Sequence, residues 1–185
     1  YHAPTATLAL ALSGAGATLF HWTASPPGLR QTHVLLPGTI TAHKIAFAPD
    51  GQQLLLACRD RVVRLVDQQS LVLAEIEGHI GTVQGLAISP RGDRMLVGAT
   101  ESGVMVYDRN GNLVLPIRPR AGGVTLATFL PDGERILLGT TARTTCIVPI
   151  DPKELVRLAH SVEMPAMLPS YLKSYKARVG DIGDD

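Results

Sequence analysis

The sequence predicts an all-β fold assembled from repeated units of four short strands. The first observation is a self-similar phrase whose three copies are anchored by Pro49, Pro90 and Pro131, spaced 41 residues apart. The second is that short apolar runs alternate with turn residues, in which proline presets φ and glycine tolerates positive φ. The third is composition, because 18 Gly and 13 Pro interrupt the chain too often for long helices. Repeats of about 40 to 45 residues with several strands each are typical of a β-propeller.

Each clear unit begins with an apolar run that leads into the turn Pro-x-Gly, followed by further runs separated by polar turns. The strands expected in chain order are 45–48, 54–58, 62–66 and 71–76 in one unit, 86–89, 95–99, 104–107 and 113–117 in the next, and 127–130, 136–140 and 144–148 in the last. An acidic residue closes each third run: Asp67, Asp108 and Asp151. The runs are almost uniformly apolar, as expected for propeller blades that stack face to face and bury both faces.

A weaker unit precedes these three. Strands are expected at 7–12, 18–22 and 31–36, with Trp22 at the closing position of its third run. The predicted units are therefore about 5–37, 38–78, 79–120 and 121–151. Residues 1–151 form a propeller segment of about three and a half blades in this prediction.

The last part of the chain differs in kind. Asp151 is suited to cap a helix, Pro152 to its first position and Glu154 to its third. We expect residues 152–185 to form a short C-terminal helix and a flexible tail.

The repeated phrase resembles WD repeats. That family combines a Gly-His pair, a Pro-Asp-Gly turn, a turn aspartate and a closing Trp-Asp, and this chain has degenerate counterparts such as Gly78-His79 and Tyr107-Asp108. The resemblance covers about residues 5–151 and implies a β-propeller. The tail after the last unit resembles that of bacterial WD-repeat proteins, in which propellers are often appended to kinases, signalling ATPases or caspase-like proteases.

The resemblance also implies structural roles for particular side chains. In the family, a histidine, a turn acid and an aromatic residue form a hydrogen-bonded set within a blade. The residues placed in such structural roles here are His79, Glu101, Tyr107, Asp60, Asp67, Asp108 and Trp22. We expect His79 to be shielded from water and within hydrogen-bond reach of its own blade, and Tyr107 to be buried against a neighbouring unit.

Charge and cysteine content narrow the classes of function. The net charge of +1 gives no reason to expect nucleic acid as a partner, and no apolar run reaches the roughly 18 residues of a membrane span. Residues 8–17 imitate the core of a signal peptide but lack a basic region before them, so a buried strand is favoured. Cys58 and Cys146 are expected to be reduced core thiols, with a disulfide or a reactive thiol as the alternatives, and a cytoplasmic location is expected.

Catalytic, cofactor and metal sites are not predicted. No histidine has a metal-ligand spacing with cysteine or another histidine. His79 with Asp60 or Glu101 could imitate a catalytic triad, but a structural hydrogen bond is the simpler explanation. The glycine-rich stretch 13–16 is expected to be a hairpin turn, since a phosphate-binding loop should open a helix. The basic stretches 59–61 and 118–120 are expected to be solvated turns, with a binding patch as the alternative.

The predicted function is a non-catalytic scaffold that binds a partner protein or another domain of the same polypeptide. Loops on a rigid propeller vary without loss of the core, which favours recognition at the rims of the blades. The alternative is a regulatory or sensor propeller of a larger signalling enzyme whose catalytic part lies outside this segment. Counting strands suggests one missing at each end, so the remaining blades are expected upstream in the same chain.

Overall fold

A computed structural model describes residues 7–12, 16–24, 27–36, 40–79, 81–119 and 122–151, and these residues form four antiparallel sheets. The first sheet holds β1 (Thr7–Leu12), β2 (Gly16–Ala24) and β3 (Pro27–Leu36). The second sheet holds β4 (Ala42–Phe47), β5 (Gln53–Cys58), β6 (Val63–Asp67) and β7 (Val72–Ile76). The third sheet holds β8 (Val83–Ile88), β9 (Arg94–Ala99), β10 (Gly103–Asp108) and β11 (Leu113–Ile117), and the fourth sheet holds β12 (Val124–Phe129), β13 (Arg135–Thr140) and β14 (Thr145–Pro149). No helix occurs within these ranges. The predicted all-β fold is confirmed, and the helix expected in 152–185 lies outside the described residues.

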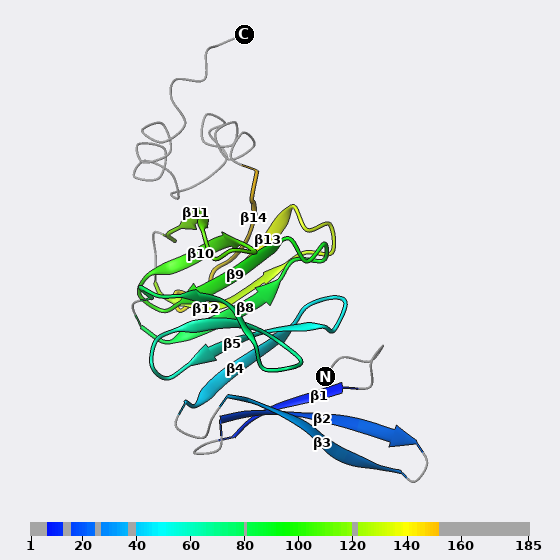
Figure 1. Cartoon of the computed structure of the whole chain (residues 1–185). Helices are drawn as coiled ribbons and strands as arrows, with labels where there is room; N and C mark the ends of the chain where they lie inside the picture. Colours follow the sequence, from blue (N-terminus) through cyan, green and yellow to red (C-terminus); the bar gives the residue numbers. More distant parts are fainter. Residues whose placement is uncertain are drawn as a thin grey trace, which may run out of the picture.

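The sheets stack in chain order, from the blue strands to the yellow ones in Figure 1. Within each sheet, consecutive strands pair with one another, so every sheet is a simple meander. The first strands of neighbouring sheets also contact each other, β4 with β8 and β8 with β12. Sheets of this kind, joined along their first strands, are blades of a propeller.

The Pro-x-Gly turns are equivalent in the three clear units, as predicted. The backbone N–H groups of Gly51, Gly92 and Gly133 donate to the carbonyl three residues earlier at 2.9, 2.8 and 2.9 Å. Their φ angles are +71°, +70° and +70°, in the left-handed region that glycine tolerates best. The local sequence Pro-x-Gly therefore determines this turn in every unit.

The almost continuous apolar runs are explained by burial on both faces of the inner sheets. In β5, Leu55 and Ala57 pack toward the third sheet, while Leu54 and Leu56 pack toward the first. All four side chains are fully buried. The period of two therefore persists, but both sets of residues are apolar because each set lies in a different interface.

The first strand of each blade starts earlier than the sequence predicted. β4, β8 and β12 begin at Ala42, Val83 and Val124, three residues before the expected starts, and these side chains are 3%, 5% and 0% exposed. The pairing with the next strand is irregular directly after each of these residues. A bulge at the same place in three blades breaks the alternation of apolar and polar residues, so the pattern concealed the strand starts.

Small residues let the third and fourth blades approach closely. A Cβ atom added to Gly85 in β8 would lie 2.5 Å from Ala127 Cβ and 2.8 Å from the Ala127 backbone nitrogen. A Cβ atom added to Gly98 in β9 would lie 3.0 Å from both Ala127 Cβ and Val124 Cγ1. These two glycines are therefore required by the contact between blades and not by turn geometry.

Candidate functional site

His79 lies in the wall between the second and third blades, just before the first strand of its unit. Its side chain is 5% exposed, and its ring meets Tyr107 edge-on with a centroid distance of 6.3 Å and an interplanar angle of 89°. Neither ring nitrogen has a hydrogen-bond partner among the described residues. Burial lowers the pKa of His79, and the nearby Ile76 backbone offsets part of this effect without meeting the geometric limits of a hydrogen bond. The ring is therefore neutral at neutral pH.

His79 is shielded from water, and its ring makes no hydrogen bond that meets the geometric limits among the described residues. Its structural role in the blade stays a prediction. Glu101, the acid placed near His79 by the repeat, is exposed, and its carboxylate stays in water. Desolvating a carboxylate costs more than one hydrogen bond to a neutral ring returns, which explains the separation.

Tyr107 is buried against the neighbouring blade, as expected. It is 5% exposed and packs with Leu55 and Val63 of the second sheet. Its hydroxyl donates to the sulfur of Met105 at 3.0 Å, and burial raises the pKa of Tyr107 to about 12. Val66, at the same position of the preceding blade, is fully buried with Ala17 of the first sheet. Trp22 lies in β2 opposite Leu29, and its side chain is outside what the structure describes.

Asp60 contacts Arg64 instead of a histidine. Asp60 Oδ1 accepts a hydrogen bond from the Val62 backbone at 3.1 Å, and Asp60 Oδ2 lies 2.7 Å from Arg64 Nη1 as an ion pair. Arg64 Nε donates to Glu75 Oε1 at 2.8 Å. Burial alone would lower the pKa of Arg64, but hydrogen bonds to Asp60, Cys58 and Glu75 raise it above its usual value. The sequence analysis did not predict the contact between Arg64 and Glu75, because it depends on the register that sets these two residues opposite each other.

The closing aspartates hold the turn that follows the third strand. Asp67 Oδ1 accepts the backbone N–H groups two and four residues ahead, at 2.9 and 2.8 Å. Asp108 does the same at 2.8 and 2.9 Å, and its hydrogen bonds with the Asn112 side chain and backbone hold the pKa of Asp108 below its usual range. Asp151 does not share this place, because Pro149 occupies the equivalent register position in β14. The structural roles assigned to these side chains remain predictions.

A cleft of about 620 Å³ opens between the second and third blades, at the ends of β5 and β7. Its lining residues are His43, Cys58, Arg59, Arg61, His79, Gly81, Thr82, Val83 and Glu101. Partial burial of the ring lowers the pKa of His43, and the positive charges of Arg59 and Lys44 lower it further. The cleft thus combines positive charge, one carboxylate and two neutral imidazoles.

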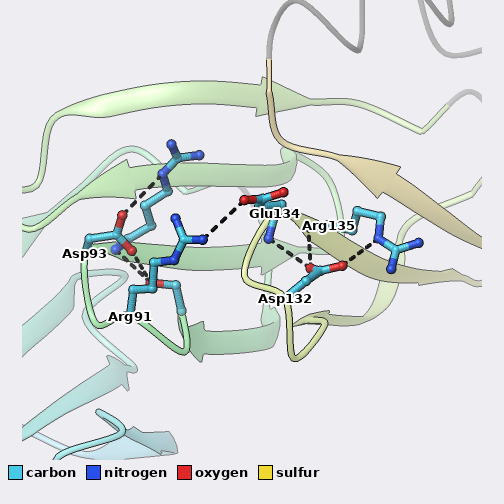
Figure 2. A network of polar contacts seen from close by, with 7 residues as sticks. Arg91, Asp93, Asp132, Glu134 and Arg135 are labelled. Atoms are coloured by element: carbon cyan, nitrogen blue, oxygen red, sulfur yellow. Dashed lines mark hydrogen bonds and ion pairs between the residues drawn. The ribbon is translucent and has the colours of Figure 1, made fainter.

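The opposite ends of the blades carry a different set of charges. Figure 2 shows Arg91 reaching from its turn to Glu134 in the next blade, with Nη2 and Oε1 3.2 Å apart. Asp132 holds its own turn through Arg135, whose Nε lies 2.6 Å from Asp132 Oδ2. Here the charged groups are paired with one another across exposed turns, so their contribution to stability is small.

The thiols and the metal-binding side chains add no further site in the described ranges. Cys58 is buried and Cys146 partly buried, both are free, and burial raises the pKa of each thiol. No group of three or more His, Cys, Asp or Glu side chains in those ranges is arranged to hold a metal ion. None of the described residues belongs to a helix with the length and apolarity that a membrane span requires.

Comparison with known proteins agrees with this geometry. Residues 70–108 match the family model described as WD domain, G-beta repeat. The matched range spans β7 to β10 and therefore joins the last strand of one sheet to three strands of the next. No curated protein matches the chain. Residues 70–108 are therefore similar to a WD repeat, and blades with the same period lie on either side of them.

Proposed function

We propose that this chain is a non-catalytic interaction module that binds a polypeptide at the ends of its blades. The polypeptide is a separate protein or another domain of the same chain. WD repeats serve in general as protein-interaction modules. The observation that carries the proposal is the cleft of about 620 Å³, which two blades line jointly with charged and polar side chains.

The packing beneath the cleft supports a binding role. Most side chains of β5, β6 and β9 are buried, so the loops that form its rim are held on a rigid base. Loops on such a base are already ordered, so binding does not carry the entropy cost of ordering them, and this favours affinity. Because residues of both blades form the walls, a ligand would contact the stack and not a single repeat.

The chemistry of the cleft argues against catalysis. A nucleophilic cysteine needs a lowered pKa, whereas burial raises the pKa of Cys58. His79 packs against the ring of Tyr107, and its ring nitrogens have no hydrogen-bond partner among the described residues. These features favour recognition over covalent chemistry.

Site-specific photo-crosslinking in cells tests the proposal. A benzophenone amino acid replaces Thr82 at the rim of the cleft, and a matched variant carries it at Asn110, which is also exposed but lies at the opposite ends of the blades. We expect crosslinks to a polypeptide from position 82 and few from position 110. Mass spectrometry separates a partner protein from another domain of the same chain. Equal crosslinking at both positions, or none at position 82, contradicts the proposal.

A further inference from the structure

We propose that the cleft between the second and third blades recognises an acidic side chain, Asp or Glu, of the bound polypeptide. This inference rests on the proposed function and names the chemistry that the partner presents. In it, Arg59 and Arg61 bind the carboxylate, and His79 supplies a further hydrogen bond from the wall of the cleft. Three independent features of the described residues support these roles.

Arg59 departs from the repeat at the point where it meets the cleft. The equivalent residues of the next two blades are Thr100 and Thr141, whose hydroxyls accept backbone hydrogen bonds from Thr82 and Gly123 at 3.1 and 3.0 Å. The Arg59 backbone N–H still makes the equivalent bond to the Thr41 carbonyl, at 2.8 Å. The turn is thus retained without the threonine hydroxyl, and an exposed guanidinium lines the cleft in its place.

Arg61 is held in an unfavourable backbone conformation. Its φ is +67°, a region in which residues other than glycine are uncommon. Arg143 occupies the same turn position two blades later with a φ of +58°. A glycine would fit this turn better, so folding alone does not explain an arginine at position 61.

His79 presents unused hydrogen-bonding capacity at the same place. His79 is 5% exposed, lines the cleft, and has no hydrogen-bond partner for either ring nitrogen among the described residues. A neutral imidazole has one donor and one acceptor. A carboxylate held by the arginines would accept the ring N–H, and the unsatisfied donor would gain a partner only in the complex.

The charge balance of the cleft favours a single carboxylate over a polyanion. Arg59 and Arg61 are opposed by Glu101, which is exposed and lines the same cleft. Arg64, just outside it, is shared by Asp60 and Glu75, so this group of three adds one further negative charge. Glu101 would repel a chain of phosphates, whereas the backbone N–H groups of a peptide can donate hydrogen bonds to its carboxylate.

The test is an NMR titration of the full chain with short capped peptides. The probes are acetyl-Gly-Asp-Gly-amide and acetyl-Gly-Glu-Gly-amide, with the Asn and Gln peptides as uncharged counterparts and inorganic phosphate as a competing anion. The signals followed are the Nε–H groups of Arg59 and Arg61 and the ring nitrogens of His79. We expect saturable shifts with the acidic peptides, and affinity lower by about tenfold for their neutral counterparts, because charge-assisted hydrogen bonds are lost.

Three variants separate binding from folding. Arg59→Thr installs the residue of the other blades, and Arg61→Gly relieves the positive φ, so both variants should melt at or above the temperature of the parent chain. Each variant should bind the acidic peptides with an affinity about tenfold lower than that of the parent chain. Arg143→Gly is the matched control, since it makes the same change in the same turn of another blade, and it should leave binding unchanged.

Several outcomes overturn the inference. They are equal shifts with acidic and neutral peptides, or no saturable shift at the cleft. Two more are a loss of peptide affinity in Arg143→Gly equal to that in Arg61→Gly, and tighter binding of phosphate than of the peptides. Crosslinking from position 82 that persists while the acidic peptides fail would leave the interaction module standing and remove carboxylate recognition alone.

Discussion

Replacing Gly85 with alanine tests the packing between the third and fourth blades. The new Cβ would lie 2.5 Å from Ala127 Cβ, 2.8 Å from the Ala127 nitrogen and 3.0 Å from its Cα. Two of these atoms belong to the backbone of β12, which is paired with β13 and cannot move without disturbing the sheet. The contact joins two different blades, so the effect measures their approach and not the stability of one hairpin.

The magnitude follows from two opposing effects. Overpacking a filled interface costs about 1–3 kcal/mol, while a Gly→Ala change restricts the unfolded chain and returns about 0.4–1 kcal/mol. We expect Gly85→Ala to lower the free energy of unfolding by about 1–2 kcal/mol. A chain of this size then melts roughly 2–8 °C lower, at about 2–4 °C for each kcal/mol.

Two other strand glycines serve as graded controls. A Cβ at Gly139 would meet Leu126 Cβ at 3.3 Å, and a Cβ at Gly28 would meet nothing within 4 Å. Urea unfolding followed by circular dichroism should rank Gly85→Ala as the least stable variant, Gly139→Ala near the parent, and Gly28→Ala at or above it. If Gly85→Ala were as stable as Gly28→Ala, the proximity of the two blades would be refuted.

Four further predictions concern single side chains. His79→Phe keeps a ring beside Tyr107 and removes two unpartnered nitrogens, so its melting temperature should match or exceed that of the parent, whereas His79→Ala should melt lower; a lower value for both would contradict the unpaired state. Because the folded pKa of His79 is lowered, the unfolded chain takes up the proton first as the pH falls below about 6.5. Stability should therefore decrease below that pH, and His79→Phe should lose less of it; identical pH profiles would be the contrary result. Asp108→Ala removes the acceptor of three hydrogen bonds and should melt lower, and since the folded pKa of Asp108 is lowered, its contribution disappears only as the pH falls through that value, below about 3.8. The decrease in melting temperature of Asp108→Ala should be largest at neutral pH. An unchanged melting temperature there would contradict the role of Asp108 in holding the turn. With a thiol reagent at mildly alkaline pH, Cys146 should react in the folded chain and Cys58 only after unfolding; rapid labelling of Cys58 would show that its burial is wrong.

The repeats and turns were predictable because their causes are local. Pro-x-Gly encodes the same turn at Pro49, Pro90 and Pro131 wherever the surrounding chain lies. Apolar runs bounded by such turns indicate strands, and their fixed period indicates blades. Local patterns were weaker where a bulge interrupts alternation, as at Ala42 and its counterparts, so the first strands were placed three residues late.

The sequence by itself determined the order and period of the strands, the turns between them and the burial of both faces of the inner sheets. Only the tertiary structure decided which side chains meet between strands and between blades. The isolation of His79 from Glu101, the pairing of Arg64 with Glu75 and the contact of Gly85 with Ala127 each depend on register or on the distance between sheets. Such contacts join residues of different strands, and no local pattern encodes their separation. The cleft at Arg59 and Arg61 arises for the same reason, because two blades supply its walls.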